Sequence, residues 1–443
     1  MSGRFAPIPD IDVSVPVGLN ERSSIDQGYV FSGRFFNSVG PTGNGYGMMA
    51  NRGAVPFSLA VERDLRLDFF RGIALFSIFI DHLAWNSLLA QFTLQALGFS
   101  DAAEVFIGIS GYTAGMVYGR AIERQGLLMA AMRMYHRVWQ LYVAHVFLFM
   151  QFMATTAYLV DTFNNAIYAE ELRAADFLKE PGVAVIKALT LQFQPAFMDI
   201  LPLYIVLLAL LPLVLIGFRL WPAGVLAASF SLWAAAQLNK SIALPAYPGP
   251  DHVWFFNPFC WQALFFLGAW CGWRGVRGGI PWLTNRWLVW LAAASALAGL
   301  LIRSSWTLHW LYDPFPALFG DALWPLLSKT NLAALRFANV LVLALLVARL
   351  IPAQAAFLAG RVARPCIMCG RHSLHVFCLG ILLATIGRLV IDEFFGGVLL
   401  QCVVSAAGIA IMIGTAAVMD WFNAGQRPSG PRVLRASATD GGV

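Results

Sequence analysis

Long apolar runs separated by shorter polar segments dominate the chain from about residue 63 onward. A membrane-spanning helix needs roughly 20 mostly apolar residues. Ten runs approach this length and predict ten transmembrane helices, near Phe69–Leu88, Ala102–Ala121, Val138–Leu159, Ile200–Phe218, Ala223–Leu238, Phe256–Trp273, Trp287–Ile302, Leu332–Ile351, Leu374–Val390 and Val398–Met419. We therefore expect an all-α, polytopic bundle over residues 63–422. Residues 1–62, rich in Gly, Pro, Ser and Asn, are predicted to form a disordered cytoplasmic arm, and residues 423–443 a cytoplasmic tail.

The composition agrees with a membrane protein and excludes a soluble one. Hydrophobic residues make up 59% of the chain and charged residues 12%, whereas a soluble protein carries about 25% charged residues. The formal net charge of +6 is no evidence for nucleic-acid binding, because a basic excess in a membrane protein usually marks its cytoplasmic loops. The six Cys show no disulfide framework, and four of them lie inside apolar runs.

The distribution of Lys and Arg between the loops predicts how the helices are oriented. Basic residues are concentrated in alternate loops, and such loops usually face the cytoplasm. The basic loops contain Arg120, Arg124, Arg133, Arg137, Arg219, Arg274, Arg277, Arg286, Arg361, Arg364 and Arg371. We therefore expect these loops and both termini on the inside. The longer loops near residues 160–199, 239–255 and 303–331 are expected to face outward.

The first predicted helix carries a polar stripe that includes Arg71 and His82. These residues are eleven positions apart, so both side chains lie on one face of a helix. The rise between them is about 16 Å, roughly half the thickness of a bilayer. Ionisable groups at such a depth usually line a cavity, which favours a functional role for His82. The alternative is that His82 only hydrogen-bonds to a neighbouring helix. Asp81 is about 100° away around the helix and is a poor direct partner of His82.

Arg133 and Arg137 form a second candidate site, at the cytoplasmic start of the third predicted helix. Like charges at this i,i+4 spacing repel each other. A bound anion would remove that repulsion, and pairs of Arg suit phosphate groups. Arg371 and His372, which enter the ninth predicted helix from the same side, are further candidate anion ligands. The alternative interpretation is a lipid-headgroup anchor or a simple topology signal.

Two carboxylates open predicted helices on the outer side, at the expected level of His82. Glu104 begins the second predicted helix and Asp199 the fourth. Either could reach His82 from a neighbouring helix and orient its imidazole. Asp199 has a plainer explanation as well, because a helix N-terminus favours a carboxylate. The small residues after Glu104 are typical of close packing between helices, and they are Gly108, Ser110, Gly111, Thr113, Ala114 and Gly115.

Aromatic residues are frequent in the predicted outer loops. An aromatic belt at the membrane interface explains most of them, but sugar rings also stack on such faces. We therefore expect Trp261, Gln262 and Trp310 to be candidate contacts of a glycan. The pair Cys366 and Cys369 has no second CxxC partner, and no metal site is predicted.

Several of these segments together resemble the OpgC family of integral-membrane succinyltransferases, which modify osmoregulated periplasmic glucans. The resemblance covers about residues 63–422 and includes the superfamily patterns of membrane O-acyltransferases called acyltransferase-three. Arg-x10-His maps onto Arg71 and His82, and RxxxR maps onto Arg133 and Arg137. The segments that carry the resemblance are Arg63–Gly72, Asp81–His82, Ser100–Gly115, Phe256–Gln262 and Gly370–Leu374.

The resemblance implies O-acyl transfer in the bacterial inner membrane, from cytoplasmic acyl-CoA to hydroxyls of a periplasmic glucan. Acyl-CoA, with succinyl-CoA favoured, would be a co-substrate, and no permanently bound cofactor is expected. The CoA phosphates would lie beside Arg133 and Arg137, with Arg71 deeper. His82 would act as general base or carry the acyl group itself. An O-acetyltransferase of another envelope glycan and a transporter of an anionic metabolite remain alternatives, and a homo-oligomer remains open.

Overall fold

The computed structural model describes residues 63–84, 87–163, 167–249, 252–277, 279, 285–394 and 396–425. The predicted N-terminal arm and most of the predicted tail lie outside these residues. Within them, all regular secondary structure is helical, apart from one isolated bridge between Pro245 and Val253. This confirms the all-α class.

Every one of the ten predicted runs falls on an α-helix, in most cases with bounds displaced by a few residues. The corresponding helices are α1 (Leu65–Asp81), α2 (Ala102–Gln125), α3 (Leu127–Phe163), α7 (Ile200–Leu220), α8 (Pro222–Leu238), α9 (Pro258–Gly275), α10 (Arg286–Leu311), α12 (Ala334–Leu350), α14 (Ser373–Glu393) and α15 (Val398–Gly425). Short helices occupy the connections, namely α4 (Ile167–Glu171), α5 (Ala175–Lys179), α6 (Pro181–Leu189), α11 (Gly320–Leu323) and α13 (Ala363–Arg371).

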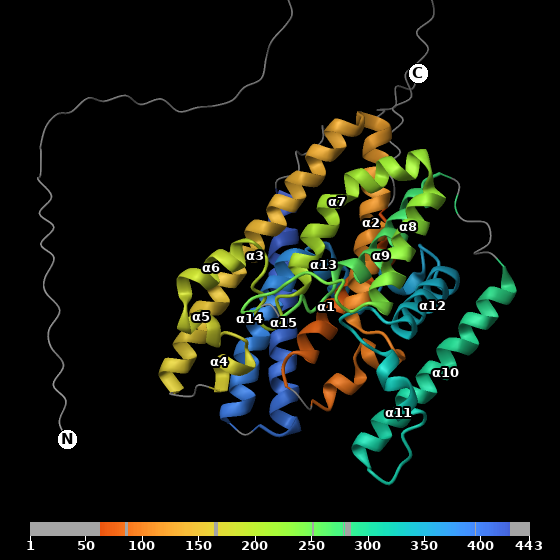
Figure 1. Ribbon diagram of the computed structural model, residues 1–443. Coiled ribbons are helices and arrows are strands. Elements are labelled where there is room, and N and C mark those ends of the chain that lie inside the picture. Colours follow the sequence, from red (N-terminus) through yellow and green to blue (C-terminus); the bar gives the residue numbers. More distant parts are fainter. Residues whose placement is uncertain are drawn as a thin grey trace, which may run out of the picture. The chain divides into compact units, whose positions relative to one another are not determined.

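Five of these helices are long and apolar enough to cross a membrane by length and composition. They are α3, α7, α10, α14 and α15. The helices α1, α8 and α12 have only 17 residues each, and α2 carries several ionisable residues at its two ends. The figure of ten spans and the inside position of the termini therefore stay predictions, and Figure 1 shows where each helix lies.

The sequence supplies N-caps at the helices that matter most for the site. Asp64 begins α1, and its carboxylate accepts a hydrogen bond of 3.0 Å from the backbone N–H of Arg66. Asp101 begins α2 in a capping box, in which the Glu104 side chain accepts from the backbone N–H of Asp101 at 2.9 Å. Because each cap satisfies donors that the helix cannot, these residues fix where the helices begin.

The first helix is shorter than predicted, because α1 ends at Asp81 although the apolar run continues to Leu88. The backbone N–H of His82 bonds to the carbonyl of Phe79 at 3.3 Å, which tightens the last turn. The hydroxyl of Thr93 donates to Asp81 at 2.7 Å and holds the chain as it turns back. His82 is therefore the C-cap residue of α1 and not a residue in the middle of a helix.

Helices α2 and α9 pack with their backbones in close contact. An added Cβ on Gly111 would lie 2.2 Å from the carbonyl oxygen of Phe265, and one on Gly115 would lie 2.0 Å from that of Ala269. Gly272 of α9 approaches α2 in the same way. The small residues that follow Glu104 therefore allow close packing of the two helices, as predicted.

Replacing Gly115 by Ala is expected to destabilise this contact. Overpacking usually costs about 1–3 kcal/mol, and here the new methyl group meets a backbone carbonyl, which cannot rotate away. The thermal unfolding midpoint of the purified protein in detergent should fall clearly. Gly414→Ala on α15 is the matched control, because no atom lies within 4 Å of its added Cβ. Equal midpoints for the two variants would contradict the packing argument.

Candidate functional site

A cavity of about 200 Å³ lies between five of the long helices and the end of α13. Its walls combine basic, hydroxyl-bearing and apolar side chains. They are Arg71 from α1, Phe106, Ser110, Thr113, Ala114, Val117 and Tyr118 from α2, Arg137 and Leu141 from α3, Leu201 and Tyr204 from α7, Arg371 from α13, and Ser373, Leu374 and Phe377 from α14.

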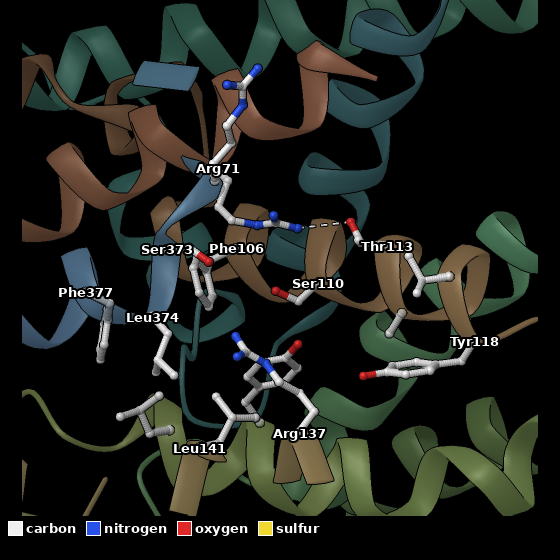
Figure 2. A pocket seen from close by; sticks show the side chains of 15 residues that line it. Arg71, Phe106, Ser110, Thr113, Tyr118, Arg137, Leu141, Ser373, Leu374 and Phe377 are labelled. Atoms are coloured by element: carbon white, nitrogen blue, oxygen red, sulfur yellow. Dashed lines mark hydrogen bonds between the residues drawn. The ribbon is translucent and has the colours of Figure 1, made fainter. Parts of the chain in front are cut away.

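Three arginines that are far apart in the sequence meet at this cavity, namely Arg71, Arg137 and Arg371. Figure 2 shows the guanidinium groups of Arg71 and Arg137 directed toward the same space from opposite sides, with Ser110 between them. The arrangement can therefore hold an anion between its walls.

Neighbouring side chains hold Arg71 in place. It is only 9% exposed. Its Nη2 donates to Oγ1 of Thr113 at 3.0 Å, the bond drawn in Figure 2, and its Nη1 lies 3.7 Å from the carboxylate of Asp68. Asp68 is itself bound by Arg63 at 2.5 Å and 2.9 Å. Because Asp68 is shared in this way, it offsets only part of the positive charge around the cavity.

The remaining two predicted anion ligands lie apart from the cavity. Arg133 is exposed and is not among the lining residues, although it is one turn from Arg137 on α3. His372 bonds through Nε2 to Asp420 of α15 at 2.8 Å. Asp420 also lies 3.7 Å from Arg371. The spacing of the two α3 arginines indicated the right helix but could not show which of them points inward.

The hydroxyl groups of the cavity were not singled out from the sequence. Ser110, Tyr118, Tyr204 and Ser373 all line it. Hydroxyl groups can donate to phosphate oxygens and can also accept. These residue types are common in membrane helices, so no spacing rule separates them from packing residues. Only their convergence with the arginines marks them.

The contact between Arg71 and Thr113 sets the register between α1 and α2. The two helices are consecutive and run in opposite directions. Eleven residues further along α1 is His82, and eleven residues back along α2 is Ala102. His82 is therefore level with the beginning of α2, about 16 Å from the arginine level. The cavity lining on α2 extends from Phe106 to Tyr118, and its part between Thr113 and Phe106 covers about 10 Å of this interval.

His82 is held in one tautomer by its own helix. Its Nδ1 hydrogen-bonds to the carbonyl oxygen of Ile78. A carbonyl only accepts, so Nδ1 carries the proton and Nε2 has the free lone pair of a base. The ring also makes an edge contact with Phe197, with 4.5 Å between the ring centroids. The predicted base therefore has a defined orientation.

The three predicted carboxylates have different surroundings. Asp81 accepts from Thr93, and the buried Glu104 pairs with Nε of Arg336 at 2.6 Å. Asp199 sits at the N-cap position of α7 but makes no capping hydrogen bond. Among the described residues its buried Oδ1 has no hydrogen-bond partner. Asp199 therefore makes no capping hydrogen bond, although its place at the start of α7 still favours a negative charge.

Asp101 and Glu104, at the start of α2, form a charged cluster with two cations that the sequence did not single out. Lys329, in the loop before α12, and Arg336, in α12, both donate to Oδ2 of Asp101 at 2.8 Å. Burial alone would raise the pKa of Asp101, but the two positive charges hold the pKa of its carboxyl well below the usual range. Lys329 and Arg336 follow Asp101 by more than 200 residues, so no local motif could have revealed the cluster.

The three predicted acceptor contacts differ in their accessibility. Trp261 is 0% exposed and donates from Nε1 to the carbonyl of Lys329 at 3.1 Å. Gln262 is also buried and bonds to Ser229 at 2.6 Å and 2.8 Å. Both act as structural contacts in this conformation. Trp310 is 45% exposed and is the one of the three with a face open to a ligand.

Comparison with known proteins identifies the family of this chain. The family model described as OpgC protein matches residues 63–424. The chain belongs to the OpgC family. No curated protein and no solved structure matches it. The resemblance found in the sequence motifs is thereby confirmed.

Membership of the OpgC family gives the chain a broad function. OpgC proteins point to glucan modification by succinylation, and hence to an acyltransferase with a glucan substrate. Together with the apolar helices, the match shows that this OpgC protein is a helical, multi-pass membrane protein.

Proposed function

We propose that this OpgC-family protein transfers a succinyl group from cytoplasmic succinyl-CoA to a hydroxyl of a periplasmic glucan across the bacterial inner membrane. One observation carries the proposal. Arg71, Arg137 and Arg371 line a single cavity, and His82 lies about 16 Å from Arg71 along α1. A polyanion site and a base are thus separated by about half a bilayer.

The donor is proposed to bind with its CoA phosphates among the three arginines. Guanidinium groups suit phosphate oxygens because they form several charge-assisted hydrogen bonds at once. The hydroxyl groups of Tyr118 and Tyr204 would add neutral donors. The narrow pantetheine arm would then follow α2 from Tyr118 toward Phe106, which directs the thioester toward the level of His82.

His82 is proposed to act as the general base through Nε2. It takes the proton of a sugar hydroxyl while the oxygen attacks the thioester carbonyl. The new C–O bond forms, the C–S bond breaks, and the proton passes from His82 to the leaving CoA thiolate. Ile78 holds the tautomer that this step requires. A variant with an acyl-His82 intermediate uses the same nitrogen as nucleophile.

Sidedness of the reaction is the direct test of this proposal. In sealed proteoliposomes of known orientation, succinyl-CoA is supplied on one face and glucan on the other. We expect product only when succinyl-CoA meets the face with Arg133 and glucan meets the face with Trp310, since neither substrate crosses a bilayer unaided. Equal product from both loadings would show that both substrates reach His82 from one compartment, and would refute transfer across the membrane.

The same vesicles distinguish a transporter from an enzyme. A transporter of an anionic metabolite would leave succinyl-CoA intact, whereas the proposed reaction releases free CoA thiol in proportion to succinylated glucan. Mass spectrometry of the glucan identifies the acyl group. When acetyl-CoA and succinyl-CoA are supplied together, a mass increase for acetyl in place of succinyl would favour the alternative O-acetyltransferase.

A further inference from the structure

Two cations and two carboxylates form one cluster at the start of α2. The Oδ2 of Asp101 accepts from Lys329 and from Arg336, each at 2.8 Å. Arg336 also binds Glu104 at 2.6 Å and is only 12% exposed, so both of its contacts are internal. Lys329 has Asp101 as its carboxylate partner, and its side chain is 34% exposed. Of the two cations, Lys329 is the one that can turn toward a ligand.

The main chain around Lys329 is firmly anchored. Its carbonyl accepts from Nε1 of the buried Trp261 at 3.1 Å. The carbonyl of Thr330 accepts from the backbone N–H of Asn257, the N-cap of α9, at 3.0 Å. The ammonium group lies 5.8 Å from the ring centroid of Phe256. The backbone of Lys329 is thus held in place, while its side chain remains partly exposed.

Lys329 lies on the same side of the molecule as the proposed base. It binds Asp101, which precedes Ala102, and the register of α1 and α2 places Ala102 level with His82. Its charge also acts on His82 and on Asp199. Arg388 acts on His82 as well, but its side chain is only 6% exposed and pairs with Glu171 and Asp392. Of these two cations, the partly exposed Lys329 is the better placed for an incoming anionic group near His82.

We propose that Lys329 binds the free carboxylate of the succinyl group during transfer and so selects succinyl over uncharged acyl groups. This inference rests on the proposed function, since it concerns the acyl group delivered to His82. In succinyl-CoA a short –CH2–CH2– linker joins the thioester carbonyl to a carboxylate. When the carbonyl is beside His82, that carboxylate needs a cation close by.

Lys329 does not have to leave Asp101 to bind a second carboxylate. The cluster pairs two cations with two carboxylates, because Arg336 binds both Asp101 and Glu104. The ammonium group of Lys329 has three N–H donors, so it can keep its contact with Asp101 and donate a second, charge-assisted hydrogen bond to the incoming carboxylate. An uncharged acyl group cannot accept such a bond in the same way. Lys329 is a specificity-determining residue in this scheme and takes no part in proton transfer.

The test compares succinyl-CoA with butyryl-CoA, in which a methyl group replaces the carboxylate. We expect Lys329→Met to lower kcat/KM for succinyl-CoA on the order of ten- to a hundredfold, the worth of one charge-assisted contact. Transfer of butyryl should stay the same or rise. Lys329→Arg keeps the charge and should retain most of the preference for succinyl. Lys240→Met is the matched control, because Lys240 is exposed in a loop, and it should leave both donors unchanged.

The outcomes separate this inference from the proposed function. If the wild-type protein transfers no acyl group from any CoA thioester, the proposed function fails. If it succinylates glucan but Lys329→Met lowers transfer of both donors equally, or changes neither, the role of Lys329 is wrong while the function stands. Binding of free CoA should be the same in Lys329→Met and wild type. A parallel loss of CoA binding would show a general structural defect and would also count against selective recognition.

Discussion

Replacing His82 by Ala is expected to reduce acyl transfer to glucan by a factor of about 10²–10⁴, the usual contribution of a general base. The loss follows from removing the one nitrogen, Nε2, whose lone pair the Ile78 contact leaves free. Binding of CoA should remain close to normal, because the arginines lie about 16 Å away along α1. The measurement is the initial rate of glucan succinylation by purified protein, alongside the dissociation constant for CoA.

His136→Ala serves as the matched control for this variant. His136 is an exposed imidazole on α3 whose hydrogen bond goes to Gln140 in the same helix, so its removal should leave the rate unchanged. His82→Ala should also keep its thermal unfolding midpoint within a few degrees of wild type, since His82 lies at the end of α1. If the His82 variant still modified glucan at more than a tenth of the normal rate, the base would have to be another residue.

Replacing Arg137 by Ala is expected to raise the dissociation constant for CoA by about ten- to a hundredfold. A charge-assisted contact to phosphate is worth roughly 1.5–3 kcal/mol, and each 1.4 kcal/mol is a factor of ten. The effect should shrink as salt is added, because exposed parts of the phosphate interaction are screened. Arg371→Ala should act in the same direction, as it lines the same cavity.

Arg133→Ala is the most informative comparison for Arg137→Ala. The two residues are one turn apart on α3, and only Arg137 lines the cavity. The same loss of charge at Arg133 should therefore change CoA affinity much less, through long-range attraction alone. Equal losses at both positions would mean that CoA spreads over the surface of α3. If neither variant lost CoA affinity, the two arginines would serve only as a topology signal.

Much of the framework followed from the sequence because it depends on local properties. Each of the ten apolar runs overlaps a helix, because a helix satisfies its backbone groups internally in apolar surroundings. Asp101 with Glu104 was readable as the beginning of α2, and the small residues after them as a packing face. The family motifs could also be recognised, because each lies within a short stretch of sequence. Helix ends were less certain, as at Asp81, where a contact with Thr93 turns the chain.

The arrangement of the site depended on contacts between distant segments. The spacing of Arg133 and Arg137 predicted an anion site, yet only the packing of α3 against α2 and α7 decides that Arg137 faces inward. Trp261 belonged to a recognisable motif, but its burial and its bond to Lys329 follow from tertiary packing. Asp199 occupied a capping position, and the structure shows that it makes no capping bond.

By itself, the sequence determined that this protein is a helical membrane protein of the OpgC family, with Arg71 and His82 separated by half a bilayer. That much is set by apolar run length, helical rise and short motifs, all of which act over a few turns of one helix. The tertiary structure alone decided that Arg71, Arg137 and Arg371 share a cavity, and that Lys329 and Arg336 meet at Asp101. Those contacts join residues far apart in the chain. The sequence around a charged residue does not indicate which distant residue it will meet in the folded protein.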